Sequence, residues 1–280
     1  MARRPLVLVV GDDAQARALA AALDHAGADG RVVDGTDALS LDERGGVAVC
    51  GHDVGSARAV VVRQVPPSPL ARSVLLALDD GARLLVHPIA ALELHQHKAF
   101  AMARLARAGV RVPESLATSD PRAARDFLAH HREVITKPLG GGAPARLLAP
   151  EQAAELSLLA RAPALLQRRV RGPEHRVYLL AGRVLVAFAV PTDGVVDARE
   201  RIDEARRVAC PTAVRSTALA AARALRLPFC AVDLRTDDDG AAVALDVNPT
   251  PSLLDYPDEG VVRARLAAWL VARSRARRGR

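Results

Sequence analysis

The segment Leu6–Val10 restricts the fold most strongly, because five consecutive Leu and Val residues have the length of a fully buried strand. Gly11, Asp12 and Asp13 follow as a turn, and an alanine-rich helix is then expected up to about Gly27. A strand, a turn and a helix in this order begin a parallel α/β layer. The turn is not a dinucleotide-binding motif, because it lacks three spaced glycines and its aspartates would repel phosphate.

The composition indicates a folded chain whose core is built from small aliphatic side chains. Of the 280 residues, 50% are hydrophobic but only 2% are aromatic, so alanine, valine and leucine must supply the core. A disordered chain is excluded, because such chains have too little apolar surface to bury. No apolar run approaches the ~20 residues of a membrane-spanning helix. No signal peptide is expected, and the three cysteines have no metal-binding spacing. We expect a cytoplasmic protein.

The net charge of +7 raises the question of a nucleic-acid partner. Almost all of the positive charge is arginine, however, with only two lysines among the 39 basic residues. This usage resembles a genome-wide codon bias, which weakens any argument for a dedicated basic patch. A nucleic-acid partner is therefore not favoured.

Hydrophobic periodicity and turn residues predict the remaining elements. In the first 90 residues, short strands are expected at 46–50, 59–63 and 83–87, with a loop at 66–69, which completes a small α/β domain. Helices are then expected at 95–108, 121–130, 151–161, 212–225 and 259–276. Strands are expected at 133–138, 146–148, 164–170, 176–180, 183–190, 229–235 and 241–247.

Lys137 ends an apolar strand and is followed, after two residues, by Gly140, Gly141 and Gly142. Glycine-rich backbone N–H groups can approach phosphate oxygens closely, and a lysine supplies a compact positive charge. The pattern is also typical of a plain hairpin turn beside a surface lysine, and the residues alone leave both interpretations open.

A candidate magnesium site lies on two strands joined by the acidic turn 236–240. Asp233 is inside the first strand, and Asp246 and Asn248 end the second, two residues apart and so on one face. Pairing of the strands can bring Asp233 opposite that face. Two carboxylates and an amide oxygen are the hard ligands that Mg²⁺ prefers. Alternatively, Asp246 and Asn248 are strand-end residues that bond the local backbone.

The rarest residues of the chain coincide with these motifs. The only lysines are Lys98 and Lys137, and the only asparagine is Asn248. On these residues the chain resembles the ATP-grasp superfamily, particularly the RimK-like carboxylate–amine ligases. The resemblance covers about residues 95–256, and the matching stretches are 108–113, 134–142, 165–170, 172–178, 231–235 and 245–249. It implies an ATP-grasp domain at 91–280, with subdomains at about 91–165 and 166–280, behind the α/β domain at 1–90.

The resemblance also implies how ATP would be held. Lys98 and Lys137 would contact the phosphates, and the glycine loop would close over them. The hinge strand would read the adenine through the backbone of Gln167, Arg168 and Val170, with Glu174 at the ribose. Asp233, Asp246 and Asn248 would hold Mg²⁺, for which Mn²⁺ could substitute.

The implied reaction is ATP-dependent ligation. A carboxylate would become an acyl phosphate, and an amine would attack it to give an amide, ADP and phosphate. Arg176 would stabilise the transferring phosphoryl group, and Arg199 resembles an arginine near the substrate carboxylate, although a solvated surface arginine fits equally. The family usually has glutamate at the position of Asp246, and the glycine often found after the asparagine is missing here.

Several alternatives stay open. The segment Ser119–Asp120–Pro121 and the residues after it also resemble enzymes that cross-link ribosomally made precursor peptides. A nucleotide-binding protein without ligase activity and a basic nucleic-acid-binding protein are the other classes. The arginine supply predicts an acidic peptide as substrate, carried by Arg63, Arg168, Arg169, Arg176 and Arg199. The amine acceptor and a homo-oligomeric state are left open.

Overall fold

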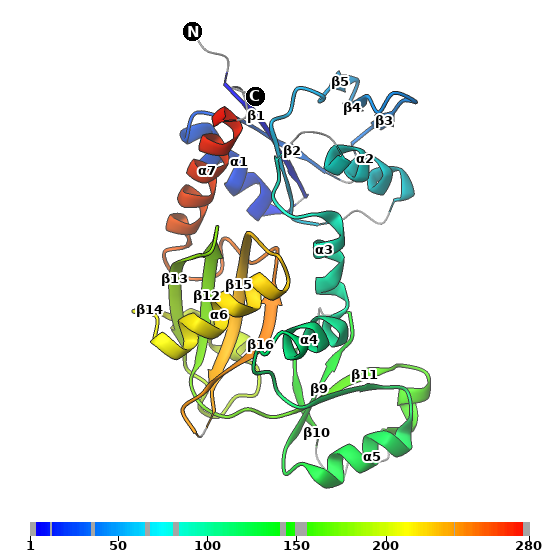
Figure 1. Ribbon diagram of the computed structural model, residues 1–280, viewed down its shortest axis with the longest axis vertical. Helices are drawn as coiled ribbons and strands as arrows, with labels where there is room; N and C mark the ends of the chain where they lie inside the picture. The colour runs from blue at the N-terminus through cyan, green and yellow to red at the C-terminus, as the bar shows by residue number, and fades with distance from the viewer. Residues whose placement is uncertain are drawn as a thin grey trace. The chain divides into compact units, whose positions relative to one another are not determined.

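The computed structural model describes residues 4–11, 13–34, 37–64, 68–80, 84–140, 144–148, 156–237 and 239–276. The chain divides into two compact units, one of Met1–Leu92 with Thr250–Arg280 and the other of Glu93–Pro249 (Figure 1). The expected boundary near residue 90 is close to this division. The C-terminal segment differs from the expectation, because it groups with the N-terminal unit and not with the second domain.

A parallel sheet in the order β2-β1-β6-β7 forms the centre of the first unit. Its strands are β1 (Leu6–Val10), β2 (Asp29–Val33), β6 (Ala59–Val62) and β7 (Leu84–Leu85), with a small antiparallel sheet of β3 (Leu39–Leu41), β4 (Val47–Val49) and β5 (His52–Asp53). The helices are α1 (Ala14–His25), α2 (Pro69–Asp80), the start of α3 (Ile89–Gln96) and α7 (Glu259–Ala276). The predicted parallel α/β layer is therefore present, whereas β2 and α2 were not expected.

Local sequence explains where two of these helices begin. Asp13 caps α1, with its carboxylate accepting a hydrogen bond from the backbone N of Ala16 at 2.6 Å, so this aspartate of the predicted turn serves the helix. Pro69, expected in a loop, is the first residue of α2, where its fixed φ angle favours a helix start.

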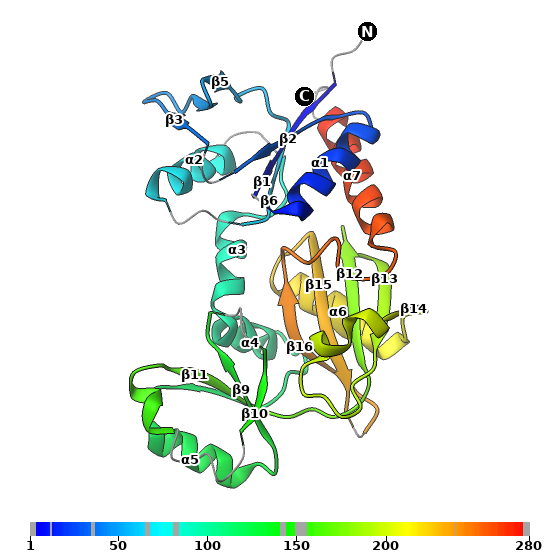
Figure 2. The ribbon, with the colours of Figure 1, turned by 180° about the vertical axis from the view of Figure 1, so that it is seen from behind.

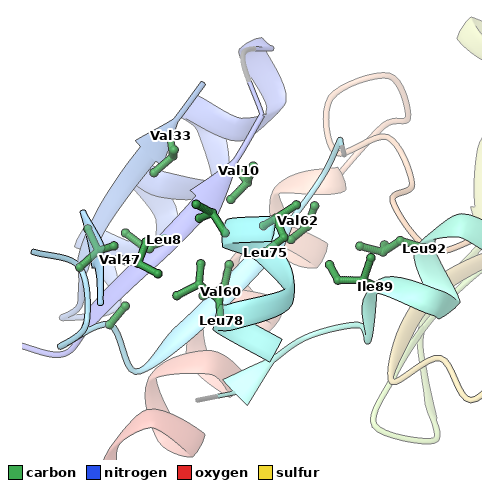
Figure 3. Packing of buried hydrophobic residues seen from close by; sticks show 13 residues of the cluster. Leu8, Val10, Val33, Val47, Val60, Val62, Leu75, Leu78, Ile89 and Leu92 are labelled. Atoms are coloured by element: carbon green, nitrogen blue, oxygen red, sulfur yellow. The ribbon is translucent and has the colours of Figure 1, made fainter. Parts of the chain in front are cut away.

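Among the described residues, the main hydrophobic cluster of the first unit contains only aliphatic side chains, as the composition predicted. Strands β1 and β6 contribute residues such as Leu8 and Val60, and α2 contributes Leu75 and Leu78 (Figure 3). All thirteen buried residues of this cluster are Val, Leu, Ile or Ala.

Arg63 joins the chain segment after residue 249 to this unit. Its guanidinium donates to the carbonyl oxygen of Pro251 at 3.1 Å and to Gln15 Oε1 at 2.7 Å, and Gln15 Oε1 also accepts from the backbone N of Leu253 at 2.9 Å. Farther along, α7 packs against α1 (Figure 2). These contacts explain why residues 250–280 belong with the N-terminal unit.

The second unit contains two antiparallel sheets. The first, in the order β10-β9-β11-β8, comprises β8 (Ser115–Thr118), β9 (Val134–Pro138), β10 (Arg146–Leu148) and β11 (Ala164–Arg168), with α5 (Pro121–His130) packed on it. α4 (Lys98–Arg107) precedes it in the chain. The helix expected at 151–161 is a 3₁₀ segment over residues 156–160, and residues 149–155 lie outside the described part.

The second sheet has the order β14-β13-β12-β15-β16, formed by β12 (Glu174–Leu180), β13 (Arg183–Val190), β14 (Arg206–Val208), β15 (Phe229–Thr236) and β16 (Ala242–Asn248). Helix α6 (Thr212–Ala224) packs across β12, β15 and β16 (Figure 1). A 3₁₀ segment, η2 (Ala198–Glu204), connects β13 to β14. Among the described residues, no helix combines the length and apolar character needed to cross a membrane.

Candidate functional site

Charged residues form a row across three neighbouring strands of the second sheet. Arg176 on β12 pairs in register with Asp233 on β15, and Asp233 pairs in register with Asp246 on β16. Asn248 is two residues beyond Asp246, and side chains two apart along a strand share a face. The strand pairing predicted from the sequence is therefore present.

Each carboxylate of this row has a cation beside it. Arg176 Nη1 lies 3.0 and 3.1 Å from the two carboxylate oxygens of Asp233, and its Nε contacts the Tyr178 hydroxyl at 3.3 Å. Lys98, the first residue of α4, places Nζ 2.8 Å from Asp246 Oδ2. The row is thus a compact arrangement of alternating charges.

Burial and mutual repulsion make these carboxylates depend on their cations. Burial raises the pKa of Asp233, the Arg176 guanidinium lowers it, the neighbouring Asp246 raises it and Lys98 lowers it again. A divalent cation would compensate the same two negative charges. Because Asp233, Asp246 and Asn248 offer hard oxygen donors at adjacent register positions, the set fits the chemistry of Mg²⁺.

The second lysine is held by a chain of side chains across the other sheet. Lys137 Nζ on β9 donates to Gln167 Oε1 on β11 at 3.1 Å, and Gln167 Nε2 donates to Ser115 Oγ on β8 at 3.1 Å. Burial lowers the pKa of Lys137, Asp246 raises it and Lys98 lowers it. Lys137 therefore lies within electrostatic reach of the charged row. Gly140 ends the described part of the turn after Lys137, and Gly141 and Gly142 lie outside the described residues.

Arg235, which the sequence analysis did not single out, contacts the segment expected to form the hinge. Arg235 donates to Val170 O at 3.0 Å, to Glu174 Oε2 at 2.9 Å and to Val196 O at 3.1 Å. Burial and the nearby Asp233 raise the pKa of Glu174 to about 7, against the lowering effect of Arg235. The sequence carried a signal for this residue, because Arg235 lies two positions after Asp233 and so on the same strand face.

The Arg168 side chain contacts the acidic turn between β15 and β16. Its guanidinium contacts Asp237 Oδ2 at 3.2 Å, and its backbone N donates to Glu114 O at 2.9 Å. Any adenine recognition by this residue would therefore use its carbonyl group.

Arg199 is held by Asp197, a second residue that the sequence analysis did not single out. Arg199 Nη2 lies 2.6 Å from Asp197 Oδ2, and its Nε lies 3.0 Å from Oδ1. Asp197 raises the pKa of Arg199, and Asp233 and Asp246 contribute in the same direction, so Arg199 is within electrostatic reach of the charged row.

The five arginines expected to attract an acidic substrate are divided between the two units. Arg63 belongs to the first unit and bonds Gln15 and Pro251 there. In the second unit the other four each contact an acidic side chain, namely Arg168 with Asp237, Arg169 with Glu133, Arg176 with Asp233 and Arg199 with Asp197. Their positive charge is therefore largely compensated within the chain.

No protein-family model matches this chain, and no curated protein matches its sequence. Solved structures do match it. The ATP-grasp ligase PsnB, in complex with a minimal precursor, is 26% identical with a TM-score of 0.83 over 95% of this chain and 98% of that one. A second PsnB structure, with a phosphomimetic variant of the minimal precursor, Mg and ADP, is 25% identical with a TM-score of 0.81 over 96% and 98%.

Two more distant structures have the same fold. The macrocyclase MdnC of Microcystis aeruginosa MRC, bound to the precursor peptide MdnA, is 16% identical with a TM-score of 0.76 over 95% of this chain and 99% of that one. A RimK-domain ATP-grasp protein of Sphaerobacter thermophilus is 21% identical with a TM-score of 0.68 over 95% and 99%.

The fold and these similarities place the chain in the ATP-grasp superfamily. The RimK-domain protein shares this fold, and the residues around Lys137 and Asn248 resemble those of the RimK-like enzymes.

Proposed function

We propose that this protein is an ATP-dependent carboxylate–amine ligase that modifies a peptide. The observation that carries the proposal is the row Arg176–Asp233–Asp246, which lies within electrostatic reach of both lysines of the chain. The similarity to PsnB and MdnC, which were solved with precursor peptides, supports a peptide as the substrate.

ATP and Mg²⁺ are the cofactors of the proposed reaction. Asp233, Asp246 and Asn248 would hold Mg²⁺, which when bound neutralises charge on the transferring phosphate. Lys98 and Lys137 would bind the phosphate oxygens, with the backbone of Gly140 beside them. The Gln167 side chain orients Lys137, so its role extends beyond the hinge backbone.

The chemistry proceeds by two bond exchanges at the substrate. A carboxylate oxygen of the peptide attacks the γ-phosphorus of ATP, and the bond to the β-phosphate oxygen breaks to release ADP. An amine then attacks the acyl carbon, phosphate leaves and the amine loses a proton. Arg176 would stabilise the transferring phosphoryl group and Arg199 the substrate carboxylate.

The test is substrate-dependent release of ADP. We expect wild-type protein to release ADP with Mg²⁺ and an acceptable peptide, and Asn248→Ala to reduce the rate at least about 100-fold through loss of a metal ligand. Asp246→Glu keeps the carboxylate and serves as the matched control with substantial turnover. Absence of nucleotide binding in wild-type protein, measured by titration calorimetry with a non-hydrolysable ATP analogue, would refute the proposal.

A peptide panel tests the substrate class. Four of the arginines expected to attract an acidic substrate contact carboxylates of the chain itself, namely Arg168, Arg169, Arg176 and Arg199. We therefore expect only a modest preference for acidic over neutral and basic peptides. That preference should weaken as the salt concentration rises, because dissolved ions reduce the range of the electrostatic attraction. The rate of ADP release at low and moderate salt measures this preference. Equal rates across the panel would show that peptide charge does not contribute to substrate recognition.

A further inference from the structure

Asp197 lies in the connection between β13 and η2 and is nearly enclosed, with 11% of its side chain exposed. Burial would raise the pKa of its carboxyl group, but the Arg199 side chain and the backbone N–H groups of Ala145 and Arg199 lower that pKa to about 2. Asp197 is therefore a stable negative charge at neutral pH, and its field reaches Lys137 and Glu174.

The two carboxylate oxygens of Asp197 bond three different groups. Oδ2 accepts a hydrogen bond from the backbone N of Ala145 at 2.8 Å, across 52 residues of sequence. Oδ1 accepts from the backbone N of Arg199 at 3.0 Å, which caps η2. The Arg199 guanidinium contacts both oxygens, with Nη2 at 2.6 Å from Oδ2.

These contacts join two parts of the proposed site. Ala145 immediately precedes β10, which pairs with β9, the strand that carries Lys137. The positive charge of Arg199 interacts electrostatically with Asp233 and Asp246. A guanidinium held in a two-point contact loses much of its rotational freedom, and so it is presented in one orientation.

We propose that Asp197 is a positioning residue that fixes the orientation of Arg199 and the start of β10 together. The expected effect of Asp197 on catalysis rests on the proposed function. Misplacement of a substrate-binding group by about 1 Å can cost on the order of 100-fold in rate.

The two roles can be separated by substitution. Asp197→Ala removes both. Asp197→Asn keeps an oxygen that can accept from Ala145 but loses the negative charge that faces Arg199, and Arg199→Lys keeps Asp197 but loses the two-point contact. Asp120 caps α5 by bonding the backbone N of Arg122, so Asp120→Ala and Asp120→Asn are matched controls for loss of a cap alone.

The first measurement is hydrogen exchange at the Ala145 amide, followed by NMR. We expect Asp197→Ala to speed this exchange at least about 10-fold, because the amide loses its acceptor. Asp197→Asn and Arg199→Lys should keep it protected, and the Asp120 variants should not change it. Unchanged exchange in folded Asp197→Ala protein would overturn the link to Ala145.

The second measurement is kcat/KM for the peptide in the single variants and in the double variant. We expect Asp197→Asn and Arg199→Lys each to lower kcat/KM on the order of 10- to 100-fold, and the double variant to lose little more, because both remove one arrangement. If the losses in kcat/KM of the two single variants multiply in the double variant, the two residues act independently, and the proposed positioning of Arg199 is refuted. If wild-type protein releases no ADP, the proposed function fails, whereas the Ala145 exchange result still decides the structural link.

Discussion

Lys98 Nζ lies 2.8 Å from Asp246 Oδ2, so the lysine that begins α4 neutralises a carboxylate that we assign to the metal. The same lysine is proposed to bind ATP phosphate. Lys98 therefore acts as the counter-ion of Asp246, and a metal ion that binds without ATP must compete with it.

This competition predicts that metal and nucleotide bind together. Lys98→Met should strengthen binding of Mn²⁺ alone by roughly 10-fold, because removing a nearby like charge favours the cation. It should weaken binding of a non-hydrolysable ATP analogue. Lys137→Met is the matched control, because Lys137 bonds Gln167 and not a carboxylate, and it should change Mn²⁺ binding less. Calorimetric titration measures both, and weaker Mn²⁺ binding by Lys98→Met would contradict the prediction.

The contact between Arg176 and Asp233 predicts a cost in stability as well as activity. Arg176 is buried, so Asp233→Ala leaves an uncompensated charge and should lower the free energy of unfolding by about 3–5 kcal/mol. The double variant Arg176→Met/Asp233→Val removes both charges and should recover most of that loss without recovering ADP release. Urea denaturation monitored by circular dichroism compares the three proteins. A double variant no more stable than Asp233→Ala would argue against the ion pair.

Glu174 should make stability fall as pH rises. Its pKa is raised from 4.5 to about 7 in the folded protein, mainly by burial and then by Asp233. Between these values the folded state retains a proton that the unfolded state has released, so this group's contribution to stability decreases as pH rises from about 4.5 to 7.

Glu174→Gln cannot titrate and should therefore gain stability relative to wild type over that interval. The change in the unfolding free energy between pH 5 and 7.5 measures this gain. Glu43→Gln alters an exposed glutamate and is the control for the loss of one carboxylate. Parallel profiles for Glu174→Gln and wild type would show that Glu174 titrates normally.

Gly172 should tolerate no side chain. It has a φ angle of +104°, and an added Cβ would overlap the carbonyl oxygen of Thr236. Gly172→Ala should therefore destabilise the protein by more than about 2 kcal/mol. Gly182 also has a positive φ, of +75°, but its Cβ would meet open space, so Gly182→Ala should cost only about 1 kcal/mol. Thermal unfolding compares the two, and equal costs would rule out the clash with Thr236.

Local pattern was sufficient to predict much of the fold. The buried run Leu6–Val10 and the turn after it predicted the parallel layer, and Glu259–Ala276 is helical over the expected range. Strand β2 was missed because its local signal is weak. Strand β2 contains Asp29, Gly30 and Arg31, and it exists because β1 supplies its hydrogen-bonding partner.

The sequence by itself predicted a set of candidate site residues, because the only asparagine and both lysines lie at positions that match a known ligase pattern. Only the tertiary structure decided the partners of the charges. Asp197 and Ala145 are 52 residues apart, and Lys98 and Asp246 are 148 apart, so no local pattern relates them. The structure also assigned Arg63 to the backbone of Pro251. Charge pairing depends on distances in space, and those distances are set by strand register and packing, which residue type alone does not encode.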